Sequence, residues 1–97
     1  MGLSNLPVEI EIANALKSRR LVMGTAESCT GGKIASMITS MAGSSEYFAG
    51  GVVSYCNEVK HDVLGVSEDN LRTYGAVSQP VVEQMARGAM RVLGCDC

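Results

Sequence analysis

The stretch TAESCTGGK, residues 25–33, decides the fold, because it separates two segments whose apolar residues follow different periods. The run RLVMGTA, which leads into it, is short, apolar and of strand length. After Gly32 the apolar residues recur at helical spacing, at Ile34, Met37, Ile38 and Met41. Gly43 then favours the end of that helix. The stretch is therefore the corner at which a strand turns into a helix.

Helix signals occur on both sides of this corner. Pro7 suits the first turn of a helix over about residues 8–18. Downstream, three polar residues are suited to cap helix starts, and two glycines to end the first two of these helices. The caps are Asn57, Ser67 and Ser78, and the glycines are Gly65 and Gly75.

A second strand is predicted in YFAGGVVSY, residues 47–55, because it is aromatic and β-branched. The pair Gly50-Gly51 inside it predicts a bulge or a close backbone approach. The predicted order of elements is α-β-α-β-α-α-α. We expect one domain over residues 1–97, an α/β fold layered as an α/β/α sandwich with a small mixed sheet. Two strands are few for so many apolar helices, and VLGCDC ends where another strand should begin, so we expect an incomplete version of its fold.

Composition excludes several classes of function. The net charge is −2 and no basic stripe is present, which argues against a nucleic-acid partner. No segment approaches the roughly 20 apolar residues of a membrane span, and the first residues do not resemble a secretory signal, so we expect a cytoplasmic protein. The cysteines, Cys29, Cys56, Cys95 and Cys97, lack the spacing of a disulfide framework or a zinc site. We predict neither a metal nor a cofactor.

Ser28 lies at the end of the first strand, where open α/β sheets bind ligands. Thr30, Gly31 and Gly32 would form the opening turn of the helix, whose N–H groups attract an oxyanion or a phosphate. A structural alternative is that Ser28 or Thr30 simply caps the helix, and Glu27 is either a solvated charge or a residue that orients the site. This is not a phosphate-binding loop of the Walker type, because Ile34 follows the lysine.

A nucleophilic serine needs a base, and Lys60 is the candidate. It lies in the first turn of the helix after Asn57, where the positive end of the helix dipole and partial burial disfavour its ammonium form. The alternative is an ordinary surface lysine. Tyr55, at the end of the second strand, could donate its hydroxyl to the same site, although a half-buried strand tyrosine is the simpler interpretation. Cys29 is the rival nucleophile, since a helix start favours the thiolate.

Three motifs, TAESCTGGKIA, GSSEYFAGGVVSYCNEVKHDVLGV and YGAVSQPVVEQMARGA, together resemble the CinA C-terminal domain family. The resemblance runs in register from about Ala13 to Leu93. Its stand-alone members are nicotinamide-nucleotide amidases, so it implies hydrolysis of nicotinamide mononucleotide to nicotinate mononucleotide and ammonia without a metal. It also implies that Ser28 is the nucleophile, Lys60 its base and Tyr55 the tyrosine of the second motif.

The family domain is roughly half as long again, and its later part, with a TGIAGP-like loop and further strands, has no counterpart in this sequence. Two hypotheses therefore stand beside each other. One is an amidohydrolase with a serine and lysine pair, and the other is a non-catalytic nucleotide-binding module of the same fold. In both, the partner is a small nucleotide, with Glu27, Cys29, Thr30, Gly31 and Gly32 as substrate-binding candidates. Apolar helix faces and open sheet edges also predict a homo-oligomer.

Overall fold

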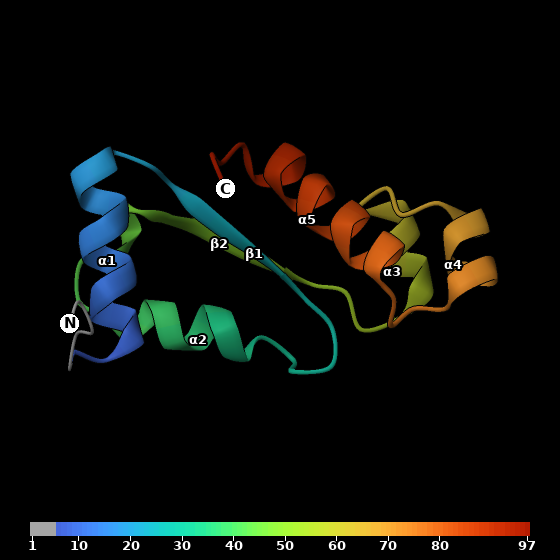
Figure 1. The fold of residues 1–97 in the computed structure, drawn as a ribbon, viewed down its shortest axis with the longest axis horizontal. Helices are drawn as coiled ribbons and strands as arrows, with labels where there is room; N and C mark the ends of the chain where they lie inside the picture. The colour runs from blue at the N-terminus through green and yellow to red at the C-terminus, as the bar shows by residue number, and fades with distance from the viewer. Residues whose placement is uncertain (1–5) are drawn as a thin grey trace, which may run out of the picture.

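The computed structural model describes residues 6–97, so the opening residues, in which we sought a secretory signal, lie outside it. Figure 1 shows the order α-β-α-β-α-α-α that the sequence predicts, with a short 3₁₀ turn at Ser44–Glu46. The elements are α1 (Val8–Arg19), β1 (Met23–Glu27), α2 (Lys33–Thr39), β2 (Phe48–Val53), α3 (Asn57–Asp62), α4 (Glu68–Tyr74) and α5 (Gln79–Leu93).

The sheet consists of β1 and β2, which run parallel. We predicted a mixed sheet, but β1 and β2 are joined by α2, and a helical crossover returns the chain in the same direction. The register shifts between Met23 and Gly24, which face Phe48 and Gly50, so the extra residue is Ala49, directly before the predicted glycine pair. A Cβ on Gly51 would lie 2.5 Å from Oγ1 of Thr25, which confirms the close approach.

Helices cover both faces of this sheet, which confirms the layered α/β/α arrangement (Figure 1). On one face, α1 and α2 bury a cluster that includes Leu16, Ile38 and Tyr47. On the other face, α5 packs with the segment after α3 around a second cluster: Leu64, Val66, Val81, Met85 and Ala89. The sheet therefore separates two small hydrophobic cores, one on each of its faces.

Two local predictions need correction. The stripe on α2 is buried at Ile38, but Ile34 is 47% exposed and Met37 is 36% exposed, so only part of the predicted apolar face is covered. Asn57 does not cap α3: it is the first helical residue, and Cys56 precedes it in an extended conformation. By contrast Ser67 caps α4 as predicted, since its Oγ accepts the N–H of Asn70.

The last residues of the chain run along the free edge of β1. The N–H of Asp96 donates to the carbonyl of Val22 over 2.8 Å, and the N–H of Gly24 donates to the carbonyl of Cys97 over 2.8 Å. These backbone hydrogen bonds resemble those between neighbouring strands of a sheet, so residues 96 and 97 lie beside β1 as the start of a further strand would. This is the place where the sequence predicts further sheet.

Gly88 holds α5 close to the segment that follows α3. A Cβ at this position would lie 1.9 Å from the carbonyl oxygen of Leu64. We expect Gly88→Ala to lower the free energy of unfolding by about 1–3 kcal/mol, because the backbone must move apart. Urea unfolding measures this change, with the neighbouring exposed Arg87→Ala as the control. Helix propensity alone predicts the opposite sign, so a Gly88→Ala variant at least as stable as the wild type would contradict the packing.

Candidate active site

The structure brings Ser28 and Lys60 together. Ser28 directly follows β1, and Lys60 lies on α3. The Nζ atom of Lys60 lies 3.0 Å from Oγ of Ser28 and 2.8 Å from the carbonyl oxygen of Ser54, to which it donates. The lysine is 2% exposed, so it is not the surface residue that the alternative interpretation assumed. A hydroxyl and a buried amine therefore share one hydrogen bond.

The parallel sheet makes this contact possible. Because parallel strands end at the same edge, the residues after β1 and β2 become neighbours. The N–H of Ser54 donates to the carbonyl of Glu27 over 2.8 Å, which joins the two strand ends. The chain then enters α3, and the N–H of Val66 donates to the carbonyl of Lys60 over 3.0 Å. The backbone on both sides of the lysine is thus fixed.

The Lys60 amine forms no salt bridge in the described part of the chain. Within residues 6–97, no carboxylate lies within 4.0 Å of Nζ of Lys60. Its two oxygen partners are neutral: the Ser28 hydroxyl and the Ser54 carbonyl.

Glu27 is buried and ties the corner to α2. It is 4% exposed and accepts bonds from the N–H groups of Ile34 (2.6 Å) and Ala35 (3.0 Å). The hydroxyls of Thr30 (2.9 Å) and Thr25 (3.3 Å) donate to the same carboxylate. Burial by itself would raise the pKa of this carboxyl, but the four hydrogen bonds outweigh burial and lower the pKa below its ordinary value of 4.5.

This carboxylate changes two expectations about the corner. Neither Ser28 nor Thr30 caps α2, because the Ser28 hydroxyl faces Lys60 and the Thr30 hydroxyl donates to Glu27. Glu27 supplies the negative charge that the helix start favours. The N–H groups of Ile34 and Ala35 are therefore already occupied and do not face a substrate anion.

We expect Glu27→Gln to destabilise the fold at neutral pH by about 1.5–3 kcal/mol, since hydrogen bonds to a buried charge are replaced by weaker ones. The folded-state pKa is depressed, so this stabilisation is present above 4.5, the ordinary value, and is lost as the pH falls through the folded value. Unfolding by urea at several pH values measures it. Glu11→Gln on the exposed side of α1 is the control. A difference between the wild type and the Glu27→Gln variant that does not shrink in acid would contradict this role.

The side chain of Tyr55 and the two glycines of the corner differ in their relation to the hydrogen-bonded pair. Tyr55 is 76% exposed and, among the residues that the structure describes, makes no hydrogen bond with Ser28 or Lys60. Gly31 and Gly32 have φ values of 66° and 106°, which glycine adopts without strain. The N–H of Gly31 donates to the carbonyl of Ser28 over 3.1 Å, so it closes the turn.

Ser28 opens onto a cavity of about 390 Å³. The cavity lies between the end of β1, the connection from α4 to α5, and the first turns of α5. Its walls are Ala26, Ser28, Cys29, Ala76, Val77, Ser78, Val82 and Met85. The sequence reasoning missed the wall at residues 76–78. The motif YGAVSQP contains the signal. Ser78 is at the N-cap position of α5 as predicted, but its Oγ donates to the carbonyl of Gly75 over 2.8 Å and does not bond a helix N–H.

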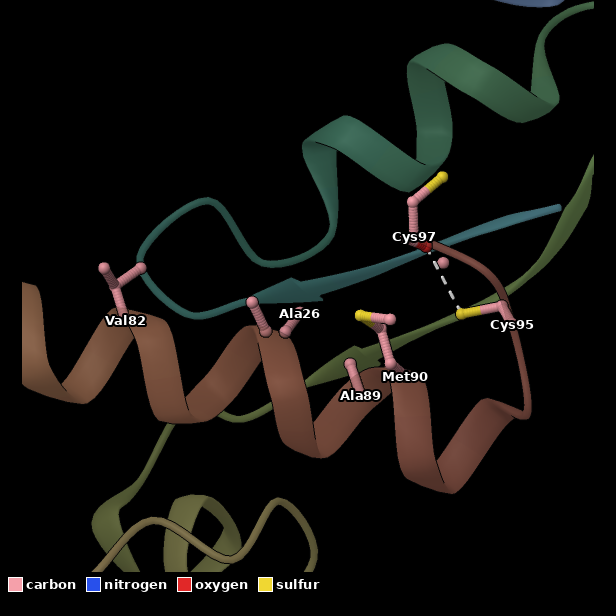
Figure 2. A pocket seen from close by; sticks show the side chains of 8 residues that line it. Ala26, Val82, Ala89, Met90, Cys95 and Cys97 are labelled. Atoms are coloured by element: carbon pink, nitrogen blue, oxygen red, sulfur yellow. Dashed lines mark hydrogen bonds between the residues drawn. The ribbon is translucent and has the colours of Figure 1, made fainter. Parts of the chain in front are cut away.

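A smaller cavity of about 130 Å³ adjoins the first one and shares Ala26 and Val82 with it. Figure 2 shows Val82, Ala89 and Met90 on the side of α5 that faces β1, with Cys95 at the far end. The Cys95 thiol donates to the carbonyl of Cys97 (Figure 2). On the predicted apolar face of α5, Met85 and Ala89 belong to the core cluster and each also lines one of the cavities, whereas Val82 lines both cavities and is 51% exposed.

The described part of the chain lacks both a metal-binding cluster and a membrane-spanning helix. Residues 6–97 contain no group of three or more His, Cys, Asp or Glu side chains arranged to hold a metal ion. In that range no helix has the length and apolar character that crossing a membrane requires.

The sequence is similar to known proteins over nearly its whole length. It matches the CinA C-terminal domain over residues 5–97. It is 51% identical over 89 residues to the nicotinamide-nucleotide amidohydrolase PncC of Enterobacter agglomerans, an alignment that covers 92% of this chain and 54% of that protein. It is 47% identical over 93 residues to a CinA-like protein of Leptospira interrogans, covering 96% of this chain and 22% of that one. The chain thus spans about half, or less, of the length of these curated relatives.

Solved structures show the same fold. A competence-damaged protein (CinA) superfamily structure from Escherichia coli aligns with a TM-score of 0.91 and 31% identity, over 99% of this chain and 58% of that one. The competence damage-inducible protein A of Klebsiella pneumoniae aligns with a TM-score of 0.89 and 36% identity, over 92% of this chain and 55% of that one. The α/β fold described above is therefore part of a larger chain in these proteins.

Proposed function

Because the chain belongs to the CinA C-terminal domain family, we propose that it is an amidohydrolase of the nicotinamide-nucleotide amidase type. The reaction is hydrolysis of nicotinamide mononucleotide to nicotinate mononucleotide and ammonia. The similarity to a nicotinamide-nucleotide amidohydrolase supports the substrate. The observation that carries the chemistry is the 3.0 Å contact between Lys60 Nζ and Ser28 Oγ at the wall of the 390 Å³ cavity.

In the first half of the reaction, Lys60 acts as the base and Ser28 as the nucleophile. A neutral amine can donate one hydrogen to the Ser54 carbonyl while its lone pair accepts the Ser28 proton. Ser28 Oγ then bonds to the carboxamide carbon, the carbon–nitrogen bond breaks, and Lys60 returns the proton to the leaving nitrogen. Ammonia departs, and an ester between Ser28 and the nicotinate group remains.

In the second half, water hydrolyses this ester. Lys60 takes a proton from the water, the hydroxide bonds to the ester carbon, and the Ser28 oxygen leaves and recovers its proton from Lys60. The products are nicotinate mononucleotide and the original enzyme. Peptide N–H groups of Thr30 and Gly32 are the donors we assign to the oxyanion, since those of Ile34 and Ala35 serve Glu27.

The test is ammonia release by the purified chain supplied with nicotinamide mononucleotide, followed with a coupled enzymatic assay. The proposal expects ammonia and nicotinate mononucleotide in equal amounts, without added metal and in the presence of a chelator. Nicotinate mononucleotide, which has no carboxamide, is the matched control and should release nothing. Absence of turnover at any pH from mildly acidic to alkaline would contradict the enzymatic assignment.

The second candidate function is a nucleotide-binding module without catalysis. One observation favours it: the chain covers 54% of the amidohydrolase that it resembles. A binding module would give heat on titration with nicotinamide mononucleotide in a calorimeter but no ammonia. Calorimetry and the ammonia assay on the same preparation therefore separate the two.

A further inference from the structure

Ser54 lies between the two strand ends that form the candidate site, and all of its polar groups are used there. It directly follows β2 and is 0% exposed, so each of these groups needs a partner inside the protein. Its N–H and its hydroxyl both donate to the carbonyl oxygen of Glu27, over 2.8 Å and 3.2 Å. Its own carbonyl accepts the bond from Nζ of Lys60 over 2.8 Å. One buried serine therefore contacts both the strand end that carries Ser28 and the side chain of Lys60.

The two bonds to Glu27 hold the backbone next to Ser28. The carbonyl of Glu27 and the N–H of Ser28 belong to one planar peptide unit, so a fixed carbonyl sets the orientation of the whole unit. The following peptide unit is held as well, because the N–H of Gly31 donates to the carbonyl of Ser28 over 3.1 Å. With a bonded peptide unit on each side, the Cα atom of Ser28 has little freedom to move away from Lys60.

The bond from Lys60 to the Ser54 carbonyl orients the amine. A lysine side chain has many rotamers, and a neutral amine also turns about its last carbon–nitrogen bond. An N–H that is held by a fixed acceptor stops this rotation, which keeps the lone pair directed to the Ser28 hydroxyl at 3.0 Å. The acceptor is fixed because Ser54 is itself bonded to Glu27.

We propose that Ser54 is a positioning residue for the reaction at Ser28. Its hydroxyl joins the end of β2 to the end of β1 and so holds the base and the nucleophile at hydrogen-bonding distance. This role rests on the proposed function of Ser28 and Lys60, but it includes no contact with the substrate, because Ser54 is fully buried and does not line the cavity beside Ser28. Loss of the hydroxyl therefore lowers the reactivity of Ser28 and leaves substrate binding unchanged.

Three substitutions separate the hydroxyl from the size of the side chain. Ser54→Ala removes the hydroxyl without adding bulk. Ser54→Thr keeps the hydroxyl and adds a methyl group, and Ser54→Val has the shape of threonine without the hydroxyl. The matched control is Ser44→Ala. Ser44 is also buried, at 9% exposure, but it lies in the 3₁₀ turn before the start of β2, at the other end of that strand.

The measurement is the rate at which a fluorophosphonate labels Ser28, followed by peptide mass spectrometry, with urea unfolding as the check that each variant is folded. Ser54→Ala and Ser54→Val should lower this rate about tenfold, since small misplacements near reacting atoms cost up to about 10²-fold. Ser54→Thr and Ser44→Ala should label at the wild-type rate. With nicotinamide mononucleotide as substrate, the loss in Ser54→Ala should fall on kcat, and KM should stay within about twofold.

Labelling of Ser54→Ala at the wild-type rate would overturn the positioning role. Equal losses in Ser54→Ala and Ser44→Ala, or in Ser54→Thr and Ser54→Val, would overturn it too, because the position or the shape and not the hydroxyl would then matter. If the added methyl group prevents folding of both larger variants, the comparison of Ser54→Ala with Ser44→Ala decides.

Other outcomes separate this inference from the proposed function. Slower labelling of Ser54→Ala in a chain whose wild type releases no ammonia from nicotinamide mononucleotide would support the positioning role and contradict the proposed substrate. Ammonia release with labelling that Ser54→Ala leaves unchanged would overturn the positioning role while the enzymatic proposal stands. A wild-type chain that is not labelled at Ser28 would overturn both.

Discussion

Replacing Ser28 with alanine is expected to reduce ammonia release from nicotinamide mononucleotide by at least about a thousandfold. The reason is that the hydroxyl oxygen of Ser28 forms the covalent bond to the carboxamide carbon. In the described chain, the other oxygen that is hydrogen-bonded to Lys60 Nζ is the Ser54 carbonyl, which is not a nucleophile. The initial rate of ammonia release, at saturating substrate, measures the loss.

Two controls make this result specific. Ser45→Ala, at an exposed position in the 3₁₀ turn, should retain the wild-type rate. Cys29→Ser should retain most of the activity, because the thiol lies beside the nucleophile and is not assigned a bond-forming step. If the Ser28→Ala variant turned over while the Cys29→Ser variant did not, the nucleophile would be the thiol and the proposed chemistry would be wrong.

Replacing Lys60 with methionine is expected to lower kcat by about 10²–10⁴-fold, the contribution of a positioned general base. Methionine is an unbranched side chain of similar length and cannot accept a proton. Lys60→Arg should fail equally, because a guanidinium stays protonated and cannot take the hydroxyl proton. The measurements are kcat and KM, and the loss should fall mainly on kcat, since Nζ contacts Ser28 and Ser54.

The control for Lys60 is Lys33→Met, at an exposed residue at the start of α2, which removes the same charge. This variant should keep kcat within a factor of a few. Thermal unfolding of the Lys60→Met variant shows whether the fold persists. Unchanged kcat in a folded Lys60→Met variant would show that the amine is not the base.

The strand-to-helix corner could be predicted from sequence because its signals are local. The apolar run before Ser28 and the helical spacing after Gly32 each depend on a few neighbouring residues. The ends of α3 were less certain, since Asn57 and Cys56 both suit a helix start and boundaries shift by one or two residues. Periodicity also identifies the apolar face of α2, but it does not show whether another element covers that face. The exposure of Ile34 could therefore not be predicted from it.

The candidate site is harder to predict from sequence than the strand-to-helix corner, because it is built by tertiary contacts. The sequence places Ser28 at the carboxyl end of the first strand and Lys60 in the first turn of a helix that follows the second strand. Their 3.0 Å contact is consistent with that placement, and their roles stay predictions. The bonds from Ile34 and Ala35 to Glu27 require the corner to fold back on itself, and no spacing rule reveals them. The wall at residues 76–78 reaches the cavity only because α5 packs against β1.

Activation of the Ser28 hydroxyl by Lys60 can be tested without substrate. A fluorophosphonate that reacts with activated serines is incubated with the chain, and the adduct is located by peptide mass spectrometry. We expect one adduct, at Ser28, whose formation is largely lost in Lys60→Met and retained in Lys33→Met. An adduct at another residue, or labelling of Ser28 at the same rate without Lys60, would contradict it.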